Sequence, residues 1–182
     1  MTIGHSTREL NEFIGLLKRF AVEQIVDVRT IPRSRHNPQF NLDTVSDSLK
    51  AERISYVHMP GLGGLRRPKA NSVNTGWRNA SFRGFADYMQ TQEFEEKLTE
   101  LIETAELKQT SVMCAELLPW RCHRSLIADA LCIRGILVKH IVSLSTITPH
   151  KLTMWAEVKG TRITYPRQAQ EDRGTGQLKL DP

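Results

Sequence analysis

The sequence predicts a three-layer α/β domain, in which a mostly parallel sheet of about five strands is flanked by helices. Segments with the spacing of amphipathic helices alternate along the chain with short apolar segments typical of buried strands. Parallel strands need crossover connections, and helical crossovers cover both faces of the sheet. The length of 182 residues and the hydrophobic content of 40% fit one domain, which we assign to residues 1–166.

The first half of the chain predicts two helices between three strands. Ser6 and Glu9 have the spacing of a capping box ahead of an apolar stripe, so Ser6 is expected to cap the first helix. The second helix follows from the one-face spacing of Val45 and Leu49. In chain order, the predicted elements are strand 2–3, helix 7–20, strand 24–28, helix 42–52 and strand 54–58.

The second half continues the alternation. Phe94, Leu98 and Leu101 recur at helical spacing and indicate a long helix. The predicted elements are helix 94–105, strand 110–114, helix 122–134 and strand 137–142, followed by a short helix within 148–158. The polar, glycine-containing segment 167–182 is predicted to be a flexible tail.

Positive charge is concentrated in one region. The net charge is +5, and residues 29–83 contain ten Lys and Arg against three acidic residues, whereas the remainder contains 15 against 17. Two long connections, 29–40 and 59–81, hold most of these bases, and long ordered loops are commonly functional. A solvated basic surface explains the same pattern, but bases in loops favour an anionic ligand or nucleic acid.

Several residues with chemical potential follow the predicted strands, where folds of this class bind ligands. Cys122 lies near the start of a predicted helix, where backbone amides and the helix dipole favour a thiolate. We therefore predict Cys122 as a nucleophile or redox centre, with His123 or His5 as acid or base and Glu116 as an alternative nucleophile or acid/base group. The simpler interpretation of Cys122, a small buried residue that only packs, stays open.

Arginines at the same edge predict an anion-binding site. Asp27 can fix Arg29 in a bidentate pair, and a fixed guanidinium is suited to gripping phosphate or carboxylate. Ser6 has the alternative role of a plain helix cap, and loop arginines often only face solvent. The predicted substrate-binding residues are Ser6, Arg29, Arg35 and Arg124.

Spacing argues against three specific sites. A phosphatase or rhodanese-type loop needs an arginine six positions after its cysteine, but tryptophan follows Cys114 and alanine follows Cys122 at that distance. A zinc deaminase needs Pro-Cys-x-x-Cys after its Cys-Ala-Glu, and Ser125 stands where the last cysteine belongs. Cys114, Cys122 and His123 lack the spacing of paired zinc knuckles, so we predict no metal and name no cofactor. Cys114 and Cys132 are assigned to the core.

Taken together and in order, several segments resemble a bacterial and archaeal family known as domain of unknown function 488. These segments are 2–6, Val26-Asp27-Val28-Arg29 with Pro32, Ser34 and Arg35, Leu62-Gly63-Gly64, 85–89, Cys114-Ala115-Glu116 and Cys122-His123-Arg124. The resemblance implies a compact α/β domain and a shared polar site, but no reaction. The implied site residues are His5, Ser6, Arg29, Arg35, Glu116, Cys122, His123 and Arg124.

We expect an enzyme that acts on a small anionic substrate, phosphate-bearing or nucleotide-like. The alternative is a non-catalytic nucleic-acid-binding module that uses the basic loops within 29–83, with Trp77, Phe82 and Phe85 available for base stacking. A third possibility is a regulatory protein without chemistry. No apolar run reaches the length of a membrane span and no secretory signal is evident, so we expect a cytoplasmic protein, of unspecified oligomeric state.

Overall fold

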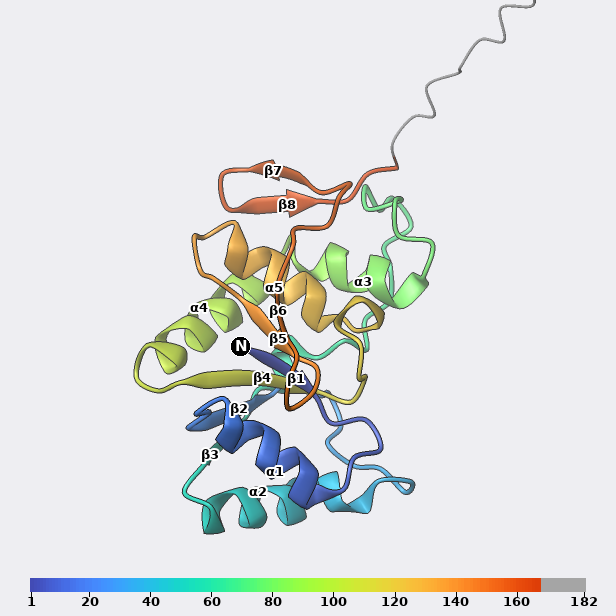
Figure 1. Ribbon diagram of the computed structural model, residues 1–182. Coiled ribbons are helices and arrows are strands. Elements are labelled where there is room, and N and C mark those ends of the chain that lie inside the picture. Colours follow the sequence, from blue (N-terminus) through green and yellow to red (C-terminus); the bar gives the residue numbers. More distant parts are fainter. Residues whose placement is uncertain (168–182) are drawn as a thin grey trace, which may run out of the picture.

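The computed structural model describes residues 1–167, so the predicted tail lies, beyond its first residue, outside the described part. A six-stranded sheet with the order β3-β2-β4-β1-β5-β6 forms the centre of the domain (Figure 1). The first five strands in this order are parallel, and β6 pairs with β5 antiparallel. The strands are β1 (Thr2–Gly4), β2 (Gln24–Asp27), β3 (Ser55–His58), β4 (Thr110–Cys114), β5 (Lys139–Ile141) and β6 (Ile147–Pro149).

Helices cover both faces of the sheet, which confirms the predicted three-layer α/β fold (Figure 1). One face carries α1 (Leu10–Arg19) and α2 (Leu42–Ala51), and the other carries α3 (Ala80–Tyr88), α4 (Gln92–Glu106) and α5 (Arg124–Cys132). Successive strand residues alternate between the faces. Ile25 of β2 accordingly packs in the cluster under α1 and α2, and Val26 packs in the cluster under the other helices.

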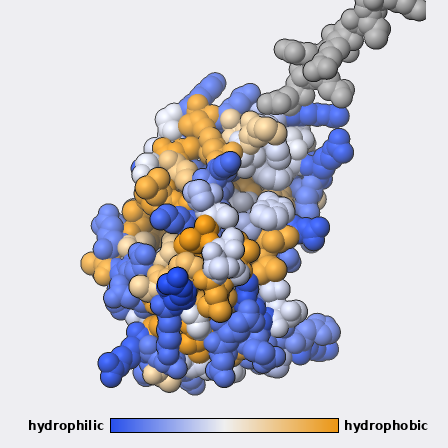
Figure 2. All heavy atoms as spheres, viewed as in Figure 1, coloured by the Kyte–Doolittle hydropathy of each residue, from blue (hydrophilic) through white to orange (hydrophobic). Residues whose placement is uncertain are grey.

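The outer surfaces of α1 and α2 are polar, as amphipathic spacing predicts. Hydrophilic side chains predominate at the lower end of the molecule, where these helices lie, and hydrophobic atoms show at the surface in the middle and upper parts of the view (Figure 2). Phe13 and Leu17 of α1 and Val45 and Leu49 of α2 are buried against the sheet. None of the helices within residues 1–167 is long and apolar enough to span a membrane.

The strand register brings the ends of β1, β2, β3 and β4 to one edge. Gly4 is level with Cys114, and Asp27 is level with both His58 and Met113. Backbone hydrogen bonds continue one residue further, because the amide of His5 donates to the Cys114 carbonyl at 3.0 Å. The residues that follow these strands therefore meet at this edge.

Two sequence predictions about local structure are wrong, and one helix was missed. Ser6 does not cap α1, whose N-cap is Glu9 without a side-chain bond; Ser6 instead has a positive φ of 51° and turns the chain. Helix α3 was not predicted. The expected helix within 148–158 is replaced by β6 and by β7 (Glu157–Lys159), which pairs with β8 (Arg162–Thr164) through a turn at Gly160, with φ of 60°. The left-handed conformation that glycine readily adopts makes this hairpin possible.

Candidate functional site

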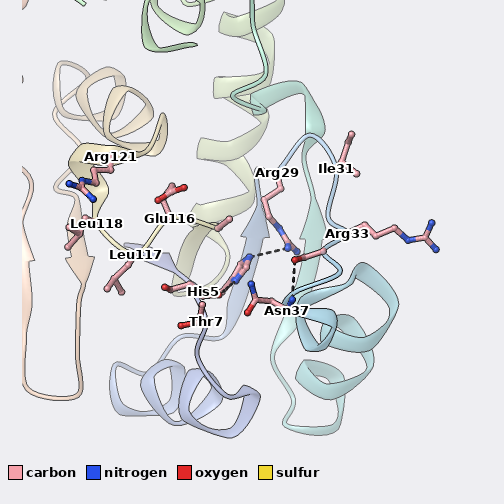
Figure 3. A pocket seen from close by; sticks show the side chains of 13 residues that line it. His5, Thr7, Arg29, Ile31, Arg33, Asn37, Glu116, Leu117, Leu118 and Arg121 are labelled. Carbon is pink, nitrogen blue, oxygen red and sulfur yellow. Dashed lines mark hydrogen bonds between the residues drawn. The ribbon is translucent and has the colours of Figure 1, made fainter. Parts of the chain in front are cut away.

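Two adjoining hollows lie at the carboxyl ends of the parallel strands. The first has a volume of about 530 Å³ and lies between the 29–37 loop and the 115–121 loop (Figure 3). The second has a volume of about 390 Å³ and reaches Cys114, Cys122 and His123. The two hollows share a wall made of Arg29, Ile31, Ala115, Glu116 and Arg121.

Arg29 is fixed by the buried carboxylate of Asp27, as the sequence predicted. Its Nε donates to both Asp27 oxygens at 2.9 and 3.0 Å, and its Nη2 donates to the Phe40 carbonyl at 2.8 Å. Although burial opposes it, the hydrogen bonds and charge of Asp27 raise the pKa of Arg29. Because Asp27 also neutralises the guanidinium, Arg29 offers a ligand one remaining Nη1 N–H rather than a full charge.

His5 lies against Arg29 and is held in its neutral form. Its Nδ1 donates to the Ser6 carbonyl at 2.8 Å, so its Nε2 accepts from Arg29 Nη1 at 3.1 Å (Figure 3). Burial lowers the pKa of His5 to about 4, and its ring stacks on Phe40 with centroids 4.2 Å apart. Both ring nitrogens are thus occupied, which suits a positioning residue better than an acid or base.

Ser6 contributes to the first hollow through its backbone conformation. Its amide donates to the Ala115 carbonyl at 2.8 Å, and its positive φ directs the chain away from the sheet towards Thr7. A non-glycine residue in this conformation costs free energy that the surrounding contacts must offset, and such residues cluster at functional sites.

Cys114, Cys122 and His123 form a buried cluster in the second hollow. The Sγ atoms of Cys114 and Cys122 lie 3.9 and 3.8 Å from His123 Nδ1. The two thiols also interact with each other: the Cys114 thiol and the charge of Arg124 lower the pKa of Cys122 to about 7, whereas the bond to Cys122, with burial, raises the pKa of Cys114. Cys114 is part of the hydrophobic core, as predicted, and it also lines the second hollow.

Three contacts fix the orientation of His123. Its Nε2 bonds to the Leu62 carbonyl at 3.1 Å, and its ring lies 5.0 Å from that of Phe85. A Cβ on Gly64 would lie 2.4 Å from Nδ1, so only glycine lets the backbone approach the imidazole this closely. The Leu62-Gly63-Gly64 segment therefore holds the imidazole of His123 in place.

Arg124 is buried and binds backbone rather than facing a hollow. Its Nη1 donates to the Glu116 carbonyl and its Nη2 donates to the Leu117 carbonyl at 2.6 Å. Within residues 1–167 it has no carboxylate partner, and its Nε is without a hydrogen bond. Arg124 thus shapes the 115–117 loop and adds positive potential beneath the site.

Glu116 and Arg121 are the exposed ionisable groups on the shared wall (Figure 3). Neither forms an ion pair in the described part of the chain. Arg35 is exposed and lines neither hollow, whereas Arg33 of the same loop lines the first. The predicted substrate-binding residues did not include Arg33, Asn37 or Arg121. Arg33 and Asn37 lie in the long 29–40 connection, and Arg121 immediately precedes Cys122.

The fold and site define a class: a doubly wound α/β protein with a polar, thiol-containing site beyond the carboxyl ends of its parallel strands. The model of the family described as domain of unknown function DUF488 matches residues 9–131, and the chain belongs to this family. The match includes Arg29, Glu116 and the Cys122-His123-Arg124 run, and begins after His5. Comparison with curated proteins and with solved structures finds no match.

Proposed function

We propose that the protein is an enzyme that acts on a small anionic, phosphate-bearing or nucleotide-like substrate at this edge of the sheet. The observation that carries the proposal is the wall shared by the two hollows, made in part by Arg29, Glu116 and Arg121. A ligand whose charged group sits in the first hollow reaches along this wall to the thiol–imidazole cluster in the second.

The first hollow supplies groups suited to an anion. Arg33 and Arg121 line it without an ion pair among the described residues, Arg29 offers one N–H, and Ser34 and Asn37 are polar neighbours. Hydrogen bonds between a guanidinium and a phosphate are charge-assisted and stronger than neutral ones. The geometry favours Arg33 over Arg35 as the second arginine of this loop to meet the substrate.

The second hollow supplies the reactive groups. Glu116 lines both hollows with an exposed carboxylate, which suits a general acid or base acting on a substrate that spans them. Cys114, Cys122 and His123 form the reacting centre, and His5 positions Arg29.

Calorimetric titration with inorganic phosphate, pyrophosphate and nucleoside diphosphates tests the proposal. We expect saturable binding of at least one of them, weakened about 10- to 100-fold by Arg121→Ala, since a hydrogen bond to a charged group contributes about 1.5–3 kcal/mol. The control is Arg67→Ala, because Arg67 is exposed and lines neither hollow. An equal loss of affinity in the two variants, or no binding of any of these anions to the natural protein, would contradict the proposed anion site.

The alternative, a nucleic-acid-binding module, has less support. Phe85 is fully buried, and Trp77 packs against Phe82, Trp155 and Tyr165 with centroids 4.8 to 5.6 Å apart. Aromatic side chains used in this way are poor platforms for base stacking. Titration with a single-stranded oligonucleotide at rising salt distinguishes the two, because phosphate-backbone binding weakens steeply with salt.

A further inference from the structure

We propose that Cys114, Cys122 and His123 bind one divalent transition-metal ion, with Zn²⁺ the best match, and that its fourth coordination position faces the second hollow. Two cysteine sulfurs and one imidazole nitrogen are a ligand set typical of zinc. Their ligand atoms all lie within 4.8 Å of one another.

The distances in the cluster approach those of a tetrahedral site. Zinc bonds of about 2.3 Å to sulfur and about 2.0–2.1 Å to nitrogen place these two ligand atoms about 3.5 Å apart. The observed distances from His123 Nδ1 are 3.9 Å to the sulfur of Cys114 and 3.8 Å to that of Cys122. These two distances exceed the tetrahedral separation by a few tenths of an ångström. The two sulfurs, which lie within 4.8 Å of each other, would have to approach to about 3.8 Å when the metal binds.

The hydrogen bond on the other ring nitrogen selects the tautomer that a metal needs. Because His123 Nε2 lies 3.1 Å from the Leu62 carbonyl, which can only accept, Nε2 carries the proton and the Nδ1 lone pair faces the two sulfurs. Histidine ligands characteristically donate their second N–H in this way. The backbone at Gly64 and the ring of Phe85 hold the imidazole in place.

Rigid elements carry the ligands. Cys114 ends the central strand β4, and Cys122 and His123 directly precede α5, with exposed fractions of 8%, 2% and 9%. The two thiolates of Cys114 and Cys122 would balance the charge of a divalent ion. The buried guanidinium of Arg124 nearby would therefore not be repelled by the bound metal. Spacing along the chain did not reveal the site, because the 115–121 loop brings the ligands together from two elements.

Three protein ligands leave one position for water or substrate, as in catalytic rather than structural zinc sites. All three ligands line the second hollow together with Glu116. Cys122 then serves as a ligand rather than as the nucleophile. The inference relies on the function proposed above only for the use of the open position, because a metal would bind here whether or not an anion does.

Cobalt titration of the reduced, metal-free full-length protein tests the proposal directly. We expect intense visible bands of tetrahedral Co²⁺ and a thiolate-to-cobalt charge-transfer band that saturate at one ion per chain and disappear on adding Zn²⁺. Weak octahedral bands without charge transfer would overturn the proposal, and this readout needs no variant.

Variants assign the ligands. Cys122→Ser and His123→Gln should each abolish the one-to-one cobalt spectrum, with folding checked by circular dichroism. Cys132→Ser is the matched control, because Cys132 lies at the end of α5 outside the cluster, and it should retain the spectrum. Retention of the cobalt spectrum in both ligand variants, or its loss in Cys132→Ser alone, contradicts the assignment of the ligands. Phosphate titration of the metal-free protein separates this result from the anion proposal, since either can fail while the other holds.

Discussion

Three buried or half-buried arginines hold the loops at the carboxyl edge by donating to backbone carbonyls. Loop carbonyls that lose contact with water need a donor, and a guanidinium supplies several in a fixed plane. Arg29 donates to Phe40, Arg124 donates to Glu116 and Leu117, and Arg8 donates to Gly4 and Val142. At the scale of single residues, part of the positive charge at this edge therefore shapes the site and part is left for a ligand.

The pair between Asp27 and Arg29 is expected to contribute strongly to stability. Asp27 is fully buried and also accepts from the Tyr56 hydroxyl at 2.6 Å, so Asp27→Ala leaves a buried cation and a phenol without their acceptor. We expect unfolding free energy to fall by about 3–5 kcal/mol, the usual cost of breaking a buried pair from one side. Urea denaturation measures this against Asp47→Ala, an exposed control. A loss similar to that of the control would show that the pair is not structural.

Gly4 should tolerate no larger residue. A Cβ at this position would lie 1.9 Å from the Glu116 carbonyl oxygen, so Gly4→Ala must displace the loop that forms the shared wall. We expect a loss of about 1–3 kcal/mol, as for overpacking of an ordered interior. Gly15→Ala is the contrast, because Gly15 lies in α1 with nothing within 4 Å and alanine should stabilise that helix by about 0.5–1 kcal/mol. Similar stability changes in the two variants would contradict the close approach.

At the scale of elements, the sequence predicted those helices and strands whose apolar residues face the sheet. It missed α3, because Gly84 interrupts the helical pattern. A Cβ at position 84 would lie 2.4 Å from the Arg66 carbonyl oxygen, so the close packing of α3 against residue 66 requires glycine there. It also missed β7, whose residues are all exposed and show no alternation. The predicted strands brought the residues that follow β1, β2 and β4 to one edge, as the structure has them. Contacts across the 115–121 loop, such as Cys114 with His123, have no signature along the chain.

Helix α3 should depend on its N-cap. The side chain of Asn79 accepts from the amides of Ser81 and Phe82, at 2.8 and 3.3 Å, and so satisfies two donors at the start of the helix. Asn79→Ala is expected to cost about 1 kcal/mol. We compare the thermal denaturation midpoint of this variant with that of Asn71→Ala, because Asn71 is an exposed loop residue. An unchanged midpoint for Asn79→Ala would mean that tertiary contacts alone define the start of α3.

For the molecule as a whole, two buried carboxylates join distant segments to the helices above the sheet. Asp129 of α5 accepts from His150, from Thr153 and from the Tyr165 hydroxyl, at 2.7 to 3.0 Å. Asp87 of α3 accepts from the amide of Lys69 and from the side chains of Ser72 and Asn74. Residues 150–165, beyond the family match, are thus tied into the same core. Asn74 joins the two groups by accepting from the Tyr165 amide at 2.9 Å.

The connection from β1 through β5 and β6 to α5 predicts that stability falls in mild acid. Thr2 Oγ1 donates to His140 Nδ1 at 2.7 Å, and His140 Nε2 donates to His150 Nδ1 at 2.9 Å. Burial is the largest cause that lowers the pKa of His140, to about 4. The charges of Arg124 and the N-terminal ammonium act in the same direction, and the charge of Asp129 opposes this only partly. The folded state therefore stays neutral at His140 where the unfolded state, with a pKa near 6.5, takes up a proton.

The sign follows from this difference in protonation. The contribution of His140 is fully present above about pH 6.5 and is lost progressively as the pH falls towards about 4, because only the unfolded state binds the proton in that window. Urea midpoints measured between pH 7.5 and pH 4.5 should fall more steeply for the natural protein than for His140→Gln, which cannot titrate. Parallel curves would show that His140 binds its proton equally well in the folded and unfolded states, and hence that the chain of hydrogen bonds joining β1 to α5 does not require its neutral form.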